Sequence, residues 1–281
     1  MKETVPLSVT ESSEAEALFH FETGAPEAVR AALGLNATRI GDVVAVSMRN
    51  DPTRYWSKAL GFGRTAAVTG ELIAEVCAFY RAEGTPLAVL QLVASVLPED
   101  WAEIRAREGI TAGSSWVKLV AEVDEVVARA GAPDRRPMDG LRVAPVEPGD
   151  AGRWASVMMR AFGMPEEHYS GMAAATVTQP DWYPQAAWLG EELVGSATVY
   201  RFGETAQLFG AAVLPEARNR GGQTGLLVAR ARTAGELGCR LLVSETGAET
   251  DGGHNSSLHN MLRLGFRVAY ERQNWVWQPA G

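Results

Sequence analysis

Two arginines and two adjacent glycines lie at a predicted strand-to-helix turn in this 281-residue sequence. The stretch PEARNRGGQTGLLVARA, residues 215–231, follows an apolar run and leads into an amphipathic segment. The first turn of a helix has N–H groups without intrahelical partners, and the helix dipole adds partial positive charge there. Glycine lets the backbone approach an anion closely, and Arg218 and Arg220 add donors suited to phosphate oxygens. The turn is therefore predicted to hold a pyrophosphate.

Two common phosphate-binding motifs do not fit this turn. A dinucleotide-binding fingerprint requires G-x-G-x-x-G after the first strand, and an acidic residue about 20 positions later. The spacing in this turn is R-x-x-G-x-Q, late in the chain. A Walker A loop requires G-K-[ST], and the turn has no lysine.

The segment VLPEARNRGGQTGLL, residues 213–227, resembles the acyl-CoA-binding segment of the GNAT superfamily of N-acetyltransferases. The family pattern is V-x-P-x-x-R-x-x-G-x-(G/A) followed by a helix, and Val213, Pro215, Arg218 and Gly221 match it in register. Gln223 stands where a small residue is usual. A second element, SSLHNMLRLGF, resembles the short family helix that ends in G-F, and the resemblance covers roughly residues 141–277.

The resemblance implies that acetyl-CoA binds in a wedge where strands 207–214 and 240–245 separate. Backbone groups near Val213 would pair with the pantetheine arm as an added strand. The amides of residues 219–224 would hold the pyrophosphate, and Asn260 would hold the arm from the far side. The predicted cofactor-binding residues are Ala212, Val213, Arg218, Asn219, Arg220, Gly221, Gly222, Gln223, Thr224 and Asn260.

The same resemblance implies direct transfer of acetyl to an amine, which requires a base, oxyanion donors and an acid for the thiolate. Glu245, at the end of a predicted strand, is the first candidate for the base, acting through water; the alternative is a solvated strand-end carboxylate. The family often has a tyrosine four residues before the G-F glycine, but Met261 stands there. Tyr270, His259 or a water molecule are the alternatives for the acid, and no metal site is predicted.

Apolar periodicity indicates the elements that must position these residues. In the C-terminal half, strands are predicted at 141–148, within 184–215, at 238–246 and at 268–278, with helices at 149–163, after residue 221 and at 256–266. In the N-terminal half, helices are predicted at 70–84 and 98–110, with strands at 86–94 and 114–123. The order helix, strand, short helix, Trp-bearing strand thus occurs twice, which favours a duplication.

The segment AGAPDRRPMDGL, residues 130–141, interrupts the periodicity and indicates a linker. The predicted fold is mixed α/β, with a largely antiparallel sheet, flanking helices and two GNAT-like domains in tandem. The predicted domains are a degenerate copy at 1–130, a linker at 131–141 and an acetyl-CoA-binding domain at 142–281.

We call the predicted turn within residues 215–231 the phosphate turn. The N-terminal half has an equivalent turn whose residues are less suited to phosphate. Its equivalent segment, residues 66–76, has one glycine, and Glu71 would repel phosphate at the helix start. This half is interpreted as a copy that supports or walls the acceptor pocket; a separate working site is the alternative. Residues 49–63 group Tyr55, Trp56 and Lys58, which either line a pocket or form an aromatic packing segment.

Composition limits the classes of partner. The net charge is −8 without a basic run, so nucleic acid and anionic membranes are not expected as partners. Cys77 and Cys239 are expected to be free buried thiols. No apolar run reaches the roughly 20 residues of a membrane span. The N-terminus does not resemble a secretory signal, so the protein is expected to be cytoplasmic.

The predicted function is transfer of acetyl from acetyl-CoA to an amine of a small molecule. By analogy with tandem members of the family, the acceptor belongs to antibiotic or secondary metabolism. The alternatives are a non-catalytic acyl-CoA-binding regulatory module and a protein or peptide N-acetyltransferase. Acceptor contacts are sought in the loop 164–184, at Glu166, Glu167, His168 and Tyr169. The sequence leaves open whether the protein is a monomer or a homodimer.

Overall fold

A computed structural model describes residues 5–130, 140–250 and 252–279. The elements of the N-terminal half are α1 (Leu7–Thr23), α2 (Glu27–Leu33), β1 (Leu35–Ile40), β2 (Val43–Met48), β3 (Lys58–Leu60), α3 (Gly70–Ala82), β4 (Ala88–Val93), α4 (Trp101–Glu108), β5 (Ile110–Glu122) and α5 (Val123–Ala130). Those of the C-terminal half are β6 (Leu141–Pro145), α6 (Ala151–Phe162), α7 (Tyr169–Ala175), β7 (Trp182–Leu189), β8 (Glu192–Phe202), β9 (Thr205–Val213), α8 (Gly222–Glu236), β10 (Leu241–Gly247), α9 (Ser256–Arg263) and β11 (Arg267–Trp277).

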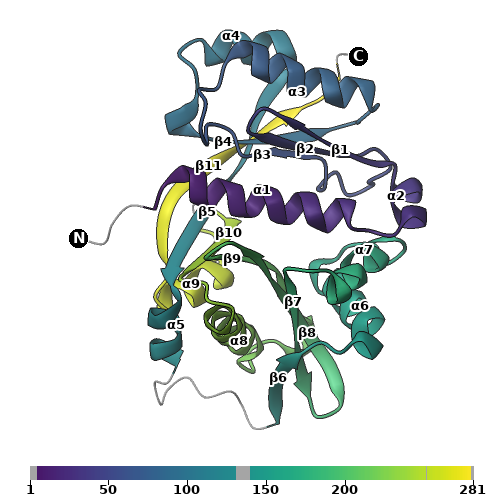
Figure 1. Cartoon of the computed structure of the whole chain (residues 1–281), viewed down its shortest axis with the longest axis vertical. Helices are drawn as coiled ribbons and strands as arrows, with labels where there is room; N and C mark the ends of the chain where they lie inside the picture. The colour runs from purple at the N-terminus through teal and green to yellow at the C-terminus, as the bar shows by residue number, and fades with distance from the viewer. Residues whose placement is uncertain (1–4, 131–139, 251, 280–281) are drawn as a thin grey trace.

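One sheet runs through both halves of the described chain, in the order β1-β2-β3-β4-β11-β5-β10-β9-β8-β7-β6. The last strand of each half is inserted into the other half. β11 lies between β4 and β5, and β5 lies between β11 and β10, with antiparallel pairing throughout. In Figure 1 these two strands run side by side through the middle of the molecule. We call this arrangement the interleaved centre.

Apolar side chains of the interleaved strands fill the core of the opposite half. Trp275 and Trp277 of β11 are buried in one cluster with Tyr80 and Trp101 of the N-terminal half. Leu119 of β5 is buried in one cluster with Leu227 and Ala231 of α8 in the C-terminal half. Fully burying such side chains stabilises the folded state by roughly 1.5–3 kcal/mol each. The exchange therefore contributes to the stability of both halves.

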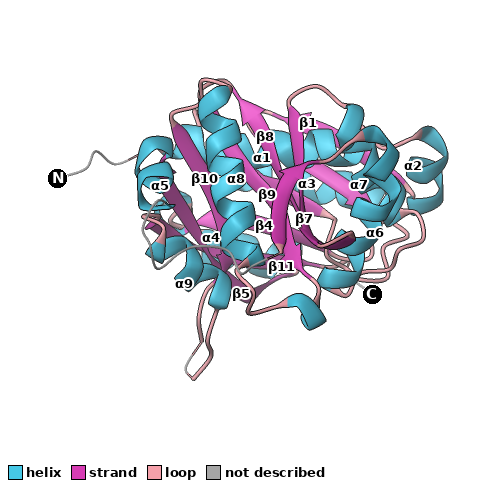
Figure 2. Cartoon of the chain, turned by 90° about the horizontal axis from the view of Figure 1, so that it is seen from below, coloured by secondary structure: helices cyan, strands magenta, loops and turns pink. Residues whose placement is uncertain are grey.

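Helices cover both faces of the sheet (Figure 2), and α1 crosses the middle of the molecule in Figure 1. α1 contacts β2 and β3 of one half and β8, β9 and β10 of the other. Its first half is unusual for a packed helix, because Thr10, Glu11, Ser13 and Glu14 are buried there. Buried charges require partners, and these lie in the interleaved centre.

The predicted fold class is confirmed: the sheet is mixed and mostly antiparallel, with flanking helices. The predicted helices at 149–163 and 256–266 correspond to α6 and α9, and the predicted strand at 114–123 begins earlier, at Ile110. Most of the predicted linker, residues 131–139, lies outside the described residues. The division at 1–130 and 142–281 stays a proposal, and two strands pair across it. Within the described ranges, every helix is too short or too polar to cross a bilayer.

Candidate functional site

The strands β9 and β10 separate at the place that the resemblance implied. They pair in parallel at Leu241–Val243 with Thr205–Gln207, and no further pairing joins them. β9 continues to Val213, paired with β8 on its other side, while β10 continues to Gly247 along β5. A β-bulge at the register shift opposite Ser196 and Thr198 turns β9 outward, and Gly210 has a positive φ of 58° within it. The backbone edge of β9 that faces β10 beyond Gln207 can therefore pair with an extended ligand.

The start of α8 has the geometry of an anion site. Gly221 precedes the helix with φ 78°, and no side chain caps the helix start. Asn219 also has a positive φ, 62°, so the turn bends sharply enough to leave the amides of the first helical turn exposed to a ligand. A Cβ at Gly222 would lie 3.2 Å from Cγ2 of Val213, so a glycine there lets the helix start against the end of β9.

A cavity of about 820 Å³ lies at this helix start. Nine of the ten residues predicted to bind the cofactor line it; Arg220 is exposed and is not among them. Those nine are Ala212, Val213, Arg218, Asn219, Gly221, Gly222, Gln223, Thr224 and Asn260. Arg218 donates from Nε to the Val213 carbonyl at 3.3 Å, which holds its guanidinium beside the end of β9. Asn260 of α9 donates to the Gln223 side chain of α8, so the two helices meet across the cavity.

A second cavity, of about 370 Å³, adjoins the first. The two cavities share the lining residues Phe162, Ala211, Gln223, Ser257 and Asn260, so they lie against each other. The second cavity extends from this junction to Glu245 on β10 and to aromatic side chains of the N-terminal half. The arrangement places a titratable carboxylate in a cavity that adjoins one suited to an anion.

Glu245 belongs to a buried group that we call the central ionic cluster, Glu11, Glu14, Lys118, Glu245 and Arg272. Lys118 of β5 ion-pairs with Glu14 and lies 3.6 Å from Oε2 of Glu245. Arg272 of β11 donates to both oxygens of Glu11, at 3.0 and 2.8 Å, and to Glu14 at 2.9 Å. Three carboxylates thus face two cations, so one carboxylate lacks a full counter-charge.

The pKa of Glu245 is raised, whereas that of the neighbouring Glu14 is lowered by Arg272 and Lys118. Burial and the charge of Glu14 raise the pKa of Glu245 to about 7, against the opposing effects of Lys118, Arg272 and a 2.8 Å hydrogen bond from Gln207. Its side chain is 12% exposed, and it lines the second cavity. A carboxylate with a pKa near 7 can accept a proton from a bound ammonium and return it to solvent at neutral pH.

Tyr270, the first alternative for the acid, lies on β11 with its hydroxyl 2.6 Å from Glu11 and 2.6 Å from Thr10. Burial and Glu11 raise its pKa far above the ordinary value. Tyr270 is not among the described residues that line either cavity, whereas Met261 does line the second one. The position that usually holds the family tyrosine thus points into the cavity, and the side chain there carries no proton.

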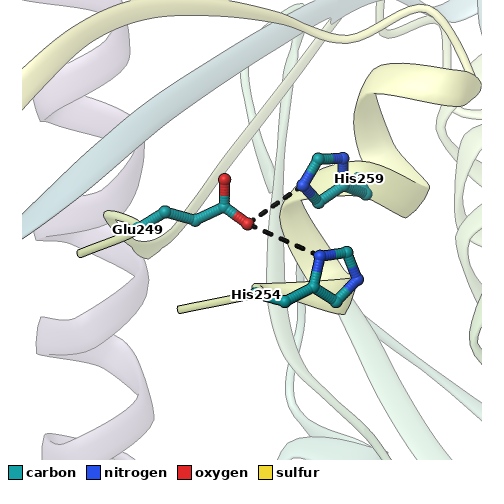
Figure 3. Close-up of side chains that lie close together, drawn as sticks. All are labelled: Glu249, His254 and His259. Carbon is teal, nitrogen blue, oxygen red and sulfur yellow. Dashed lines mark hydrogen bonds and ion pairs between the residues drawn. The ribbon is translucent and has the colours of Figure 1, made fainter. Parts of the chain in front are cut away.

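His259, the second alternative, lines the larger cavity, and Figure 3 shows its ring facing Glu249 beside His254. Its Nε2 is 2.9 Å from Oε1 of Glu249, and Nδ1 of His254 is 3.9 Å from the same oxygen. These three ligand atoms lie within 4.8 Å of one another, a grouping able to hold a metal ion, although the sequence predicts no metal. His259 does not line the second cavity among the residues described there. His259 therefore belongs to the larger cavity and not to the one that contains Glu245.

The phosphate turn and its N-terminal counterpart differ in how the helix start is satisfied. α3 is capped by Thr69, whose side chain accepts from the Leu72 N–H at 3.2 Å. That helix start thus already has a hydrogen-bond acceptor of its own, unlike the start of α8.

The residues in the loop 164–184 that were predicted to contact the acceptor substrate lie elsewhere: Tyr169 donates to Asp51 at 2.7 Å, and Glu166 accepts from Ser156. None of Glu166, Glu167, His168 and Tyr169 lines either cavity among the described residues.

Residues of the N-terminal half complete the site, and sequence reasoning found only some of them. Tyr55 and Trp56 line the second cavity, and Trp56 is also buried in an apolar cluster where it stacks on Phe21, so this segment contributes both to a pocket and to aromatic packing. Trp116 and the central ionic cluster around Glu245 were missed. The spacing of Glu11 and Glu14 would have indicated that both lie on the same face of a helix, because they are three residues apart. Nothing in that spacing identified Arg272 as their partner.

Comparisons with known proteins agree with this geometry. Residues 153–266 match the model of the acetyltransferase (GNAT) family. No match was found among curated proteins. The chain is similar in fold to a GCN5-related N-acetyltransferase from Kribbella flavida, with 15% identity, a TM-score of 0.65 and coverage of 98% of this chain and 96% of that chain.

Two further solved structures match the whole length. One is a GCN5-related N-acetyltransferase from Sphaerobacter thermophilus, with 16% identity, a TM-score of 0.60 and coverage of 99% and 95%. The other is a tandem GNAT protein from the clavulanic acid biosynthesis pathway, with 16% identity, a TM-score of 0.61 and coverage of 99% and 98%. The family model thus matches the part of the chain that contains the turn at Gly221, and the full-length fold is similar to that of a tandem GNAT protein.

Proposed function

We propose that the chain transfers an acetyl group from acetyl-CoA to a primary amine of a small molecule. The observation that carries the proposal is that the cavity at the uncapped start of α8 adjoins the cavity that contains the buried carboxylate of Glu245. Neither part alone distinguishes an enzyme from a binding module. A carboxylate with a pKa of about 7 in a cavity next to an anion site favours the enzyme.

The residues around the larger cavity fit acetyl-CoA. The amides at the start of α8 and the Arg218 guanidinium would hold the pyrophosphate, and the free edge of β9 would pair with the amides of the pantetheine arm. Asn260 would hold the arm from α9. The bound cofactor supplies an activated acetyl thioester, and this chain supplies its alignment with the amine.

Glu245 takes the first proton from the ammonium of the acceptor, directly or through water, and passes it to solvent. The neutral amine then attacks the acetyl carbonyl carbon, so that a C–N bond forms as the C–S bond breaks. The second proton lost from nitrogen ends on the sulfur of coenzyme A. Met261 cannot donate that proton, so water is the proposed donor. Neither Tyr270 nor His259 lines the cavity that contains Glu245.

The direct test is release of free thiol from acetyl-CoA in the presence of a panel of amines. Thiol release that depends on the amine, with the acetylated amine identified by mass spectrometry, supports the proposal. Tight acetyl-CoA binding by calorimetry without turnover on any amine would instead indicate a binding module. Acetylation of peptides in preference to small amines would indicate a peptide N-acetyltransferase.

The rate should depend on pH through Glu245. Because its ionised form is the base, kcat/KM should fall as pH decreases through an apparent pKa of about 7 and reach a plateau above it. The measurement is the log kcat/KM profile between pH 5.5 and 9 with saturating acetyl-CoA. A profile that is flat through neutral pH would remove Glu245 from the proton transfer.

Replacing both arginines, Arg218→Ala with Arg220→Ala, should weaken acetyl-CoA binding by about 10–100-fold, because charged hydrogen bonds of this kind contribute about 1.5–3 kcal/mol. The single variants Arg218→Ala and Arg220→Ala separate the contributions of the two arginines to acetyl-CoA binding. Arg218 lines the cavity and Arg220 does not, so Arg218→Ala should account for most of the loss. Calorimetric titration with acetyl-CoA measures both. Unchanged affinity in the double variant contradicts the pyrophosphate site.

A further inference from the structure

The walls of the cavity beside Glu245 are mostly apolar and come from both halves of the chain. Tyr55, Trp56 and Trp116 of the N-terminal half line it. Residues of α6, β9 and the loop after α6 also line it, namely Met158, Met159, Phe162, Met164 and Phe209. The aromatic side chains make a rigid wall, with the Tyr55 and Trp116 ring centroids 6.4 Å apart and those of Tyr55 and Trp56 5.1 Å apart. Such surfaces favour flat or aliphatic ligand bodies.

The charges of this cavity are few and of opposite sign. Among the described residues that line it, Glu245 and Arg230 are the charged ones. Arg230 of α8 is 4% exposed and donates to the Leu226 carbonyl at 3.3 Å. Burial lowers the pKa of Arg230 to about 9, so it is still a cation at neutral pH. The cavity therefore has one carboxylate, Glu245, that can pair with an ammonium group of a ligand. It also has one fixed cation, Arg230, that would repel a second ammonium group of the same ligand.

A further cation lies behind the aromatic wall. Nζ of Lys58 is 3.4 Å from the centroid of the Tyr55 ring and 5.5 Å from that of Trp116. Lys58 is buried, so its charge is poorly screened by solvent. It occupies a cation–π position on the Tyr55 ring. A polycation would have to bury its additional charges against apolar side chains, beside Arg230 and Lys58, without partners.

We infer that the acceptor is a small amine with a single positive charge on an apolar body of aromatic size, and that Trp116 of the N-terminal half is a residue that determines this specificity. The inference rests on the proposed function. A cavity of about 370 Å³ leaves room for a small body only. Peptides are disfavoured because few of their backbone groups would find hydrogen-bond partners: Gln223, Ser257 and Asn260 lie at the junction with the larger cavity, and Ser244 and Thr246 are the other uncharged side chains of the lining with polar groups suited to a backbone.

The experiment compares three acceptors with the full-length protein and acetyl-CoA: 2-phenylethylamine, spermidine and the tripeptide Ala-Ala-Ala. The kcat/KM for 2-phenylethylamine should exceed that for each of the others by at least roughly 100-fold. Equal or faster transfer to spermidine or to the tripeptide overturns the inference while leaving the proposed transfer reaction intact. Thiol release with none of the amines, despite acetyl-CoA binding, overturns the proposed function and the inference with it.

The role of Trp116 is tested by Trp116→Ala and the conservative Trp116→Phe. Trp116→Ala should raise KM for 2-phenylethylamine by about 10-fold or more, Trp116→Phe should restore most of the loss, and the affinity for acetyl-CoA should not change. Trp188→Phe is the matched control, since Trp188 lies on β7 beside Arg142 and Arg153 and lines neither cavity among the described residues. An unchanged KM in Trp116→Ala, with thermal unfolding like that of the wild type, excludes this role.

Discussion

Glu245→Gln should lower kcat for acetyl transfer by roughly 10²–10⁴-fold, the range typical of a general base, while the dissociation constant of acetyl-CoA stays the same. Glutamine keeps the shape of the side chain and the contact with Gln207, but it cannot accept a proton at neutral pH. The fall in rate below pH 7 should also disappear, because the group that titrates there is gone. Steady-state rates across pH, together with calorimetric titration of acetyl-CoA, measure both effects.

Glu204→Gln provides the matched control for this variant. Glu204 comes directly before β9, next to the residues of β9 that pair with β10. Its side chain is 69% exposed. The change removes the same charge without entering either cavity, so the rate should remain near that of the wild type. If Glu245→Gln retains the wild-type rate and pH profile, the base lies elsewhere and the proposed proton transfer is wrong.

Arg272→Met should lower the free energy of unfolding at pH 7 by about 3–5 kcal/mol, because it leaves Glu11 and Glu14 buried without their main counter-charge. The arginine side chain is 1% exposed and donates to both carboxylates from β11. The loss should be measured by urea unfolding. A decrease below about 1 kcal/mol, within the range of an exposed ion pair, would show that α1 is not held by this cluster.

The loss of unfolding free energy caused by Arg272→Met should depend on pH. Burial opposes ionisation of Glu14, but Arg272 and Lys118 outweigh it and lower the pKa of Glu14 well below its ordinary value of 4.5. A lowered pKa contributes stability that is present above pH 4.5 and lost as pH falls through the folded-state value. The difference in the free energy of unfolding between the wild type and Arg272→Met should therefore become smaller below pH 4.5. Arg240→Met, at an arginine 79% exposed, is the control with no such difference.

The parts of the site that were predictable from sequence depend on local geometry. The turn at Gly221 and the start of α8 are encoded within a dozen residues, so their conformation follows from glycine and helix-start chemistry. Glu245 was found because it ends a short apolar strand. What the sequence could not reveal are contacts across the interleaved centre, such as Lys118 with Glu14, 104 positions apart, and Arg272 with Glu11, 261 apart.

Residues with familiar roles were also misleading without the register of the sheet. Tyr270 was a reasonable acid from its position after the G-F element, but its strand pairs with β4 and β5 and brings the hydroxyl to α1. Trp116 carried no signal, because a tryptophan on a strand is usually part of a core. Its place at the cavity follows from β5 lying beside β10, where Trp116 pairs with Gly247.

The exchange of last strands gives this single polypeptide the topology of an intertwined dimer whose two subunits have been joined end to end. In a symmetric dimer both copies keep the same sequence, so any change improving one site alters both. Fusion removes that constraint. Under the proposed function, the C-terminal half would keep the turn at Gly221 and the carboxylate of Glu245, and the N-terminal half would be free to vary its acceptor-facing residues, while each half still supplies a strand to the sheet of the other.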